Sequence, residues 1–130
     1  MTENMEMPSE TEDRQRILLA DDEASIRRIL ETRLKMAGYD VYTAQDGEEA
    51  VAMYKEYKPD VVTMDITMPK KTGIEALKEI VAFDSAANVI MVSAMGQEER
   101  VKESILSGAK NFVVKPFTPE KLEEVINKIK

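Results

Sequence analysis

The stretch Val61-Val62-Thr63-Met64-Asp65-Ile66-Thr67-Met68-Pro69 carries the clearest fold signal in the chain. Four apolar or β-branched residues run directly into an aspartate, and a proline closes the loop that follows. A short apolar run between turn signals predicts a strand buried on both faces, as in the middle of a parallel sheet. Side chains just past the carboxyl ends of such strands face the ligand crevice, and Asp65 has that position.

Three other apolar runs also end in polar or charged residues. They are residues 17–20 before Asp21 and Asp22, residues 89–92 before Ser93, and residues 112–114 before Lys115. If these strands are parallel neighbours, their carboxyl ends meet at one edge of the sheet. We therefore expect three carboxylates, a hydroxyl and an ammonium group to converge there.

The rest of the chain fills in as strands that alternate with helices. Asp46 with Glu49, and Thr72 with Glu75, have the spacing of helix N-terminal capping pairs, and Thr118 precedes a proline that suits the first position of the last helix. Five strands and five helices in alternation predict a single α/β domain, with right-handed crossovers and a parallel sheet covered on both sides. The spacing alone does not give the strand order.

Apolar residues at helical spacing indicate which side chains should reach the core. We expect the first helix to bury Ile26, Ile29, Leu30 and Leu34, and the last helix to bury Leu122, Val125, Ile126 and Ile129. The helix over residues 97–107 is thinly apolar, with Val101, Ile105 and Leu106 as its expected anchors.

Composition excludes several classes of function. The chain has 130 residues without Cys or His, so disulfides, thiolate chemistry and histidine chemistry are all excluded. No apolar run approaches a membrane span and no signal peptide is evident, which favours a cytoplasmic protein. Residues 1–14 are expected to form a disordered acidic tail, because Glu3, Glu6, Glu10, Glu12 and Asp13 lie there.

Charge is nearly balanced beyond this tail. The net charge of −7 leaves 20 acids against 18 bases in residues 14–130, which argues against a nucleic-acid-binding surface. We expect residues 15–130 to form the whole folded domain, with no attached output domain and no membrane partner.

The acids Asp21, Asp22 and Asp65 point to a metal site. Three clustered carboxylates repel one another, so keeping all of them ionised costs free energy unless a cation lies nearby. Oxygen ligands favour a hard cation, with Mg²⁺ (or Mn²⁺) the natural choice, and Mg²⁺ in turn invites phosphate oxygens. Lys115 would supply a positive countercharge and Ser93 a hydroxyl donor, while a carboxylate can itself become an aspartyl phosphate. Each of these residues taken alone could have an ordinary structural role. Their placement together at the ends of predicted neighbouring strands favours a functional site.

The motifs Leu18-Leu19-Ala20-Asp21-Asp22-Glu23, Met64 to Pro69 with Gly73, Ser93-Ala94 and Lys115-Pro116-Phe117 resemble those of the receiver domains of two-component response regulators. The resemblance covers almost the whole folded body. Residues 21–28 resemble receivers of DNA-binding regulators, whereas residues 63–69 and 93–97 resemble stand-alone chemotaxis receivers. The resemblance to receiver domains implies a flavodoxin-like, doubly wound sheet of strand order 2-1-3-4-5.

The resemblance also implies a role for each site residue. Asp65 would be the phosphoacceptor, and Asp21, Asp22 and the backbone carbonyl of Thr67 would complete the metal ligands. Contacts to the phosphoryl group would come from Thr67, Ser93, Ala94 and Lys115. Ser93 and Phe112 would act as the switch, Ser93 swinging in and Phe112 turning inward behind it, and the Lys115-Pro116 bond would be cis.

The implied partners are proteins. A sensor histidine kinase, or a small phosphodonor, would supply the phosphoryl group. A downstream protein target would bind the helix over residues 97–107, the Phe112 strand and the last helix. We expect a monomer or weak dimer that is a switch rather than an enzyme, with at most self-catalysed phosphorylation and dephosphorylation.

Other functions remain open from the sequence. A phosphorylation-independent pseudo-receiver or adaptor would have the same fold. A phosphatase of the haloacid-dehalogenase type also uses an aspartyl nucleophile, but it normally has a second acid where this chain has Thr67. A flavodoxin-like FMN carrier is disfavoured by the acids after the first strand, and a nucleotide enzyme by the absence of glycine-rich phosphate motifs.

Overall fold

Strand β3, Val61–Asp65, lies in the middle of a five-stranded parallel sheet, and all five of its residues are buried. The computed structural model describes residues 14–129 of the chain. The other strands are β1 (Arg16–Ala20), β2 (Asp40–Ala44), β4 (Val89–Ser93) and β5 (Asn111–Val114). Their order, β2-β1-β3-β4-β5, confirms the flavodoxin-like order that the family resemblance implied.

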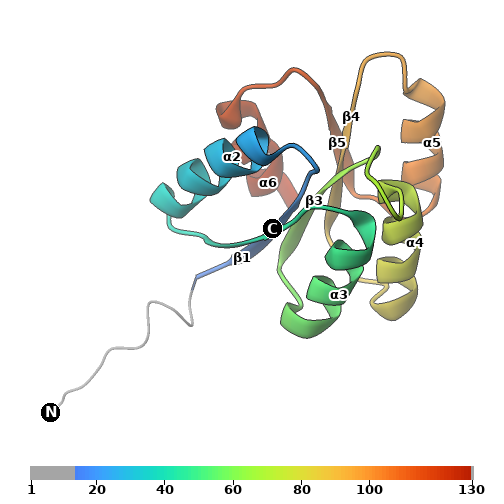
Figure 1. Ribbon diagram of the computed structural model, residues 1–130, viewed down its shortest axis with the longest axis horizontal. Coiled ribbons are helices and arrows are strands. Elements are labelled where there is room, and N and C mark those ends of the chain that lie inside the picture. Colours follow the sequence, from blue (N-terminus) through green and yellow to red (C-terminus); the bar gives the residue numbers. More distant parts are fainter. Residues whose placement is uncertain (1–13, 130) are drawn as a thin grey trace, which may run out of the picture.

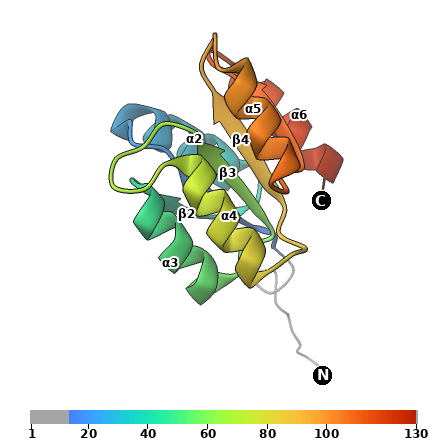
Figure 2. The ribbon, with the colours of Figure 1, turned by 90° about the vertical axis from the view of Figure 1, so that its right-hand side faces the viewer.

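Helices cover both faces of the sheet (Figure 1). One face carries α2 (Ala24–Met36) and α6 (Pro119–Ile129), and the other carries α3 (Gly47–Tyr57), α4 (Gly73–Phe83) and α5 (Glu98–Leu106). Figure 2 shows the last three side by side. Each face has its own apolar core, because alternate residues of the buried strands point to opposite sides.

The predicted helix starts are formed by the expected caps. The side chain of Asp46 accepts a hydrogen bond from the backbone N–H of Glu49 at 2.8 Å. Thr72 and Glu75 form a complete capping box before α4, each side chain accepting from the other residue's backbone N–H. Thr118 Oγ1 accepts from the first turn of α6. These caps satisfy N–H groups that a helix leaves unpaired, and they fix where α3, α4 and α6 begin.

Three predicted core residues are wrong. Ile29 on α2 is 59% exposed, and Ile105 and Leu106 on α5 are 43% and 89% exposed. On α5 the only fully buried residue is Ser104, whose hydroxyl donates to the carbonyl of Arg100 at 2.8 Å. A hydroxyl that satisfies itself within its own helix can be buried at little cost, so α5 turns a polar residue inward and leaves apolar ones in solvent.

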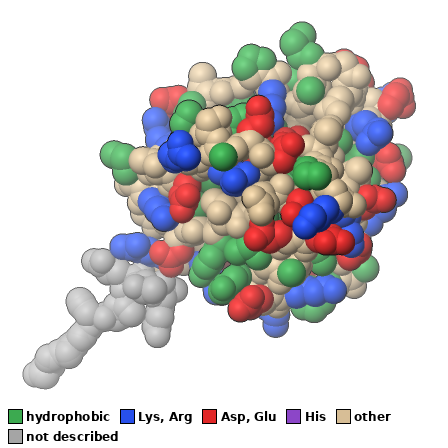
Figure 3. Space-filling model, in the orientation of Figure 1, with side chains coloured by type: hydrophobic (Ala, Val, Ile, Leu, Met, Phe, Trp, Pro, Cys, Tyr) green, Lys and Arg blue, Asp and Glu red, His purple; other side chains and the backbone are tan. Residues whose placement is uncertain are grey.

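The predicted tail, residues 1–14, lies outside the described residues except for Arg14. Arg14 forms an exposed ion pair with Asp40 at 3.4 Å. Across residues 14–129, no helix combines the length and apolar character needed to cross a membrane. Basic and acidic side chains are interspersed on the face shown in Figure 3.

Candidate functional site

The three predicted metal-ligating aspartates converge at the carboxyl edge of the sheet. Asp21 and Asp22 follow β1, and Asp65 ends the neighbouring strand β3. One carboxylate oxygen from each lies within 4.8 Å of the other two. Asp21 and Asp65 are buried whereas Asp22 is exposed, so the cluster opens to solvent on one side.

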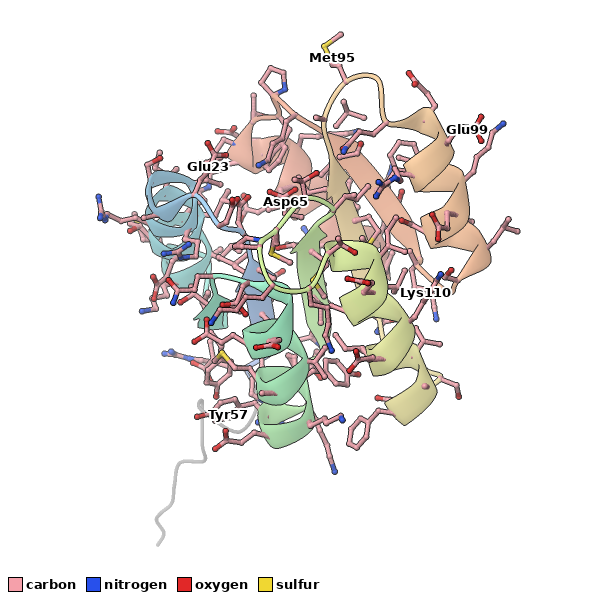
Figure 4. The ribbon with its side chains drawn as sticks, turned by 45° about the vertical axis from the view of Figure 1, so that its right-hand side comes forward. Glu23, Tyr57, Asp65, Met95, Glu99 and Lys110 are labelled. Atoms are coloured by element: carbon pink, nitrogen blue, oxygen red, sulfur yellow. The ribbon has the colours of Figure 1, made fainter. Side chains whose placement is uncertain are left out.

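Asp65 lies at the centre of this edge (Figure 4). Its Oδ1 accepts from the backbone N–H of Thr67 at 3.3 Å, and its Oδ2 accepts from Lys115 Nζ at 3.0 Å. Burial raises the pKa of the Asp65 carboxyl above its ordinary value and outweighs the hydrogen bond from Lys115, which lowers it; the charge of Asp21 adds to the rise. A nearby divalent cation would favour the ionised form.

Lys115 contacts more carboxylates than expected. Its Nζ lies 3.0 Å from Asp65, 3.2 Å from Asp21 and 3.2 Å from Glu23. Burial lowers the pKa of Lys115, but the hydrogen bond and charge of Asp65, together with the other acids, outweigh it and raise the pKa. Lys115 therefore stays a cation and neutralises part of the negative charge at this edge.

Two glycines allow the loop over residues 66–72 to lie close to its neighbours. A Cβ on Gly73 would overlap the carbonyl oxygen of Asp65, and a Cβ on Gly47 would overlap the carbonyl oxygen of Lys71. The Gly73 N–H donates to the carbonyl of Ile66 at 2.8 Å, which closes the loop. The loop that carries Thr67 is thereby held against both β3 and the start of α3.

Ser93 ends β4 and is buried, but its hydroxyl donates to the carbonyl of Val113 at 3.4 Å. It is thus turned toward β5. Phe112 on that strand is 41% exposed, so its ring points outward in this structure. The Lys115-Pro116 bond is cis, as the resemblance implied.

The loop after β4 brings Ala94 and Thr67 together through a residue that the sequence did not single out. The Ala94 N–H donates to the side-chain oxygen of Gln97 at 2.6 Å. The Gln97 Nε2 donates to Thr67 Oγ1 at 3.2 Å. Met95, beside this contact in sequence, points away from the site at the tip of the loop (Figure 4).

The side chains at the cluster fit a hard divalent cation. All three candidate side-chain ligands are carboxylates, and the chain has no Cys or His to attract a softer metal. Because Asp22 is exposed, an ion could reach the cluster from solvent. Asp21, Asp22 and Asp65 would hold Mg²⁺ or Mn²⁺.

A comparison with known protein families matches residues 17–127 to the response regulator receiver domain. The chain belongs to this family. As a receiver it is a domain of two-component signalling, with the fold and the acidic edge described above.

The receiver is similar in sequence to chemotaxis proteins and to a transcriptional regulator. It is 51% identical to the chemotaxis protein CheY of Thermotoga maritima over 115 residues, which cover 88% of this chain and 96% of that protein. It is 44% identical to the probable transcriptional regulator ycf27 of Guillardia theta over 129 residues, 99% of this chain and 50% of that protein. Both resemblances noted in the sequence are thus found among its relatives.

A solved structure supports the same family assignment. The receiver matches a chain of the CheX-CheY-BeF3-Mg+2 complex from Borrelia burgdorferi with a TM-score of 0.84 and 41% identity, over 88% of each chain.

Three residues of the receiver's site were missed by the sequence reasoning. Glu23 contacts Lys115, Gln97 bridges Ala94 and Thr67, and an Arg27 side-chain N–H donates to the backbone carbonyl of Asp21 at 2.6 Å. Glu23 had a signal, because it extends the acid pair after β1. Gln97 and Arg27 had none, since each reaches the site by folding its side chain back over the edge.

Proposed function

We propose that this receiver accepts a phosphoryl group on Asp65, in a Mg²⁺-dependent reaction, from a sensor histidine kinase or a small phosphodonor. It then binds a protein target through α5, β5 and α6. The proposal is carried by one observation, the convergence of Asp21, Asp22, Asp65 and Lys115 at a single edge of the sheet.

In the proposed reaction an Asp65 carboxylate oxygen attacks phosphorus. The new O–P bond forms as the P–N bond to the kinase imidazole breaks, and the imidazole nitrogen keeps the electron pair. With acetyl phosphate the P–O bond breaks and acetate leaves. Lys115, already 3.0 Å from Asp65, would pair with the transferred group, and the Thr67 and Ala94 N–H groups would donate to its oxygens.

A divalent cation would be held by Asp21, Asp22 and Asp65, with the Thr67 backbone carbonyl as a further ligand. When bound, such an ion offsets the repulsion between a carboxylate and an incoming phosphoryl anion. The similar Borrelia burgdorferi structure is a complex with BeF3 and Mg+2, which supports the assignment by similarity.

The proposed switch connects Ser93 to Phe112. For the Ser93 hydroxyl to bond a phosphoryl oxygen, it has to leave the Val113 carbonyl. A hollow of about 320 Å³ lies beside Ser93 and is lined by Phe112, Val101 and the loop over 94–98. This hollow offers room for the Phe112 ring to turn inward once Ser93 has moved, and such a packing change has two discrete states.

The proposed output surface consists of α5, the edge strand β5 and α6. Apolar side chains are exposed on it, namely Ile105, Leu106, Phe112 and Val114. Because β5 is the last strand of the sheet, its outer edge is open to a partner. Under this proposal the partners are proteins in the cytoplasm, including the kinase, and the Borrelia burgdorferi complex of CheX with CheY supports a protein target by similarity.

The test is Mg²⁺-dependent phosphorylation by acetyl phosphate, followed by intact-mass spectrometry. Wild-type protein should gain one phosphoryl group, and Asp65→Asn should gain none. The matched control, Glu48→Gln, removes an exposed carboxylate on α3 that is not part of the site and should be modified like the wild type. Labelling that survives in Asp65→Asn would remove the acceptor assignment, and an unlabelled wild type would favour a phosphorylation-independent receiver.

A further inference from the structure

Gln97 is out of keeping with its surroundings. In the stretch over residues 94–100 it alone is half-buried, and the other six residues are exposed. It occupies the N-cap of α5, yet its side chain makes no capping hydrogen bond to that helix. The side chain instead folds back toward the acidic edge. Its Oε1 accepts from the Ala94 N–H at 2.6 Å and its Nε2 donates to Thr67 Oγ1 at 3.2 Å.

We propose that the Gln97 carboxamide is an internal competitor of the phosphoryl group. It takes the Ala94 N–H in the unmodified protein and has to be displaced when Asp65 is phosphorylated. This inference rests on the proposed function, because it assigns Ala94 and Thr67 to the phosphoryl environment. It adds a residue that opposes modification and that links the site directly to α5.

The competition follows from the hydrogen-bonding capacity of the loop. A backbone N–H is a single donor, and at 2.6 Å from Gln97 Oε1 the Ala94 N–H is fully engaged. A phosphoryl oxygen gains this donor only after the carboxamide has left. Because hydrogen bonds to an ionised acceptor are about twice as strong as those between neutral groups, the phosphoryl group wins the exchange. The lost internal bond lowers the affinity for the phosphoryl group.

Displacement of Gln97 is also a displacement at the start of a helix. The Gln97 carbonyl accepts the first backbone hydrogen bond of α5, from the Val101 N–H at 3.0 Å. The helix that follows buries only Ser104 fully, so few contacts resist its movement. Phosphorylation of Asp65 therefore affects the start of α5 by displacing the Gln97 side chain. This coupling acts in addition to the one through Ser93 and Phe112.

The test uses beryllofluoride, which mimics a phosphoryl group. Its binding in the presence of Mg²⁺ is measured by isothermal titration calorimetry. Gln97→Ala removes the competitor and should bind roughly two- to tenfold more tightly than wild type, which is the weight of one internal hydrogen bond. Gln97→Glu keeps an acceptor for Ala94, strengthens it with a charge and should bind more weakly than wild type. Gln45→Ala removes an exposed carboxamide at the same edge of the sheet and should match wild type.

Hydrogen exchange of the protein without metal or beryllofluoride gives an independent readout. The Ala94 amide and the first turn of α5 should exchange faster in Gln97→Ala than in wild type. Equal or weaker beryllofluoride binding by Gln97→Ala, or unchanged exchange at Ala94, would overturn the inference while leaving the proposed function intact. If wild type itself fails to bind beryllofluoride, the proposed function fails and this inference fails with it.

Discussion

Asp65 experiences opposing influences on its charge. Burial and the neighbouring Asp21 favour the protonated carboxyl, whereas Lys115 and the Thr67 N–H favour the carboxylate. The pKa of Asp65 is raised, so the effect of burial outweighs that of the hydrogen bonds. A bound divalent cation would reverse that balance, because it interacts only with the ionised form.

The raised pKa predicts a particular pH dependence of Mg²⁺ binding. As pH falls from neutrality, the affinity should begin to weaken above the pH at which an ordinary aspartate protonates. Below the Asp65 pKa it should fall by about tenfold per pH unit, because one proton is displaced for each ion bound. Titrations followed by NMR at successive pH values would measure this, and an affinity that stays flat until the ordinary aspartate range would contradict it.

Asp65 should make the stability of the protein, measured without added metal, depend on pH. Its contribution should have the opposite sign to that of a salt-bridged carboxylate, which loses stabilising energy as pH falls. Since the pKa of Asp65 is higher in the folded than in the unfolded state, the folded protein holds the proton more firmly in the range between the two pKa values. The contribution of Asp65 to the free energy of unfolding therefore rises as pH falls through the folded pKa. Asp65→Asn should lack this contribution, which provides the control.

The positions of the site residues could be predicted because each follows an apolar run. Strand ends fix where Asp21, Asp65, Ser93 and Lys115 lie, whatever the path of the loops between them. Contacts made by long side chains could not be predicted in this way. Gln97 reaches Thr67 only because the loop after β4 turns back over the edge, and residue spacing does not encode that path.

At the scale of single elements, the capping box of α4 is a local and testable feature. Thr72→Ala should lower the free energy of unfolding by about 1 kcal/mol, because the Glu75 N–H loses its acceptor. Thr72→Ser keeps the hydroxyl and should lie close to wild type. Urea unfolding of the three proteins would measure this, and an equal loss in both variants would show that the hydroxyl is not what matters.

Gly47 tests how α3 supports the loop over residues 66–72. Gly47→Ala places a Cβ on the carbonyl of Lys71 and should lower the free energy of unfolding by about 1–3 kcal/mol, the usual cost of overpacking. It should also weaken Mg²⁺ binding, because the displaced loop carries Thr67. Glu48→Ala, one residue along the same helix and exposed, should change neither quantity. Wild-type stability in Gly47→Ala would mean that the loop yields without cost.

Helix positions were predictable from period and caps, but the orientation of a helix about its own axis was less so. On α2 the buried residues are Leu30 and Leu34, and Ile29 lies next to this stripe in solvent. On α5 three apolar residues, Val101, Ile105 and Leu106, are too few to decide which face turns inward, and Ser104 takes the buried position. Element type was thus readable from spacing, whereas burial at the margins depended on the neighbours.

At the scale of the whole molecule, the proposed switch couples the carboxyl edge of the sheet, where Asp65 lies, to the surface formed by α5, β5 and α6. The Lys115 N–H donates to the Ser93 carbonyl at 2.7 Å, so the ends of β4 and β5 are tied together beside Asp65. Beryllofluoride with Mg²⁺ should therefore change backbone NMR shifts along α5, β5 and α6, and much less along α2 and α3. Changes confined to the loops around Asp65 would rule out this output surface.

The three carboxylates around Lys115 have a consequence for ion competition. The ammonium group is a counterion that the chain itself carries, present at a fixed and high local concentration. A divalent cation would have to share Asp21 and Asp65 with it, so its affinity should be lower than the same acids would show without Lys115. The same ammonium group offsets part of the repulsion between Asp21 and Asp65, which allows these two acids to lie close together inside the protein.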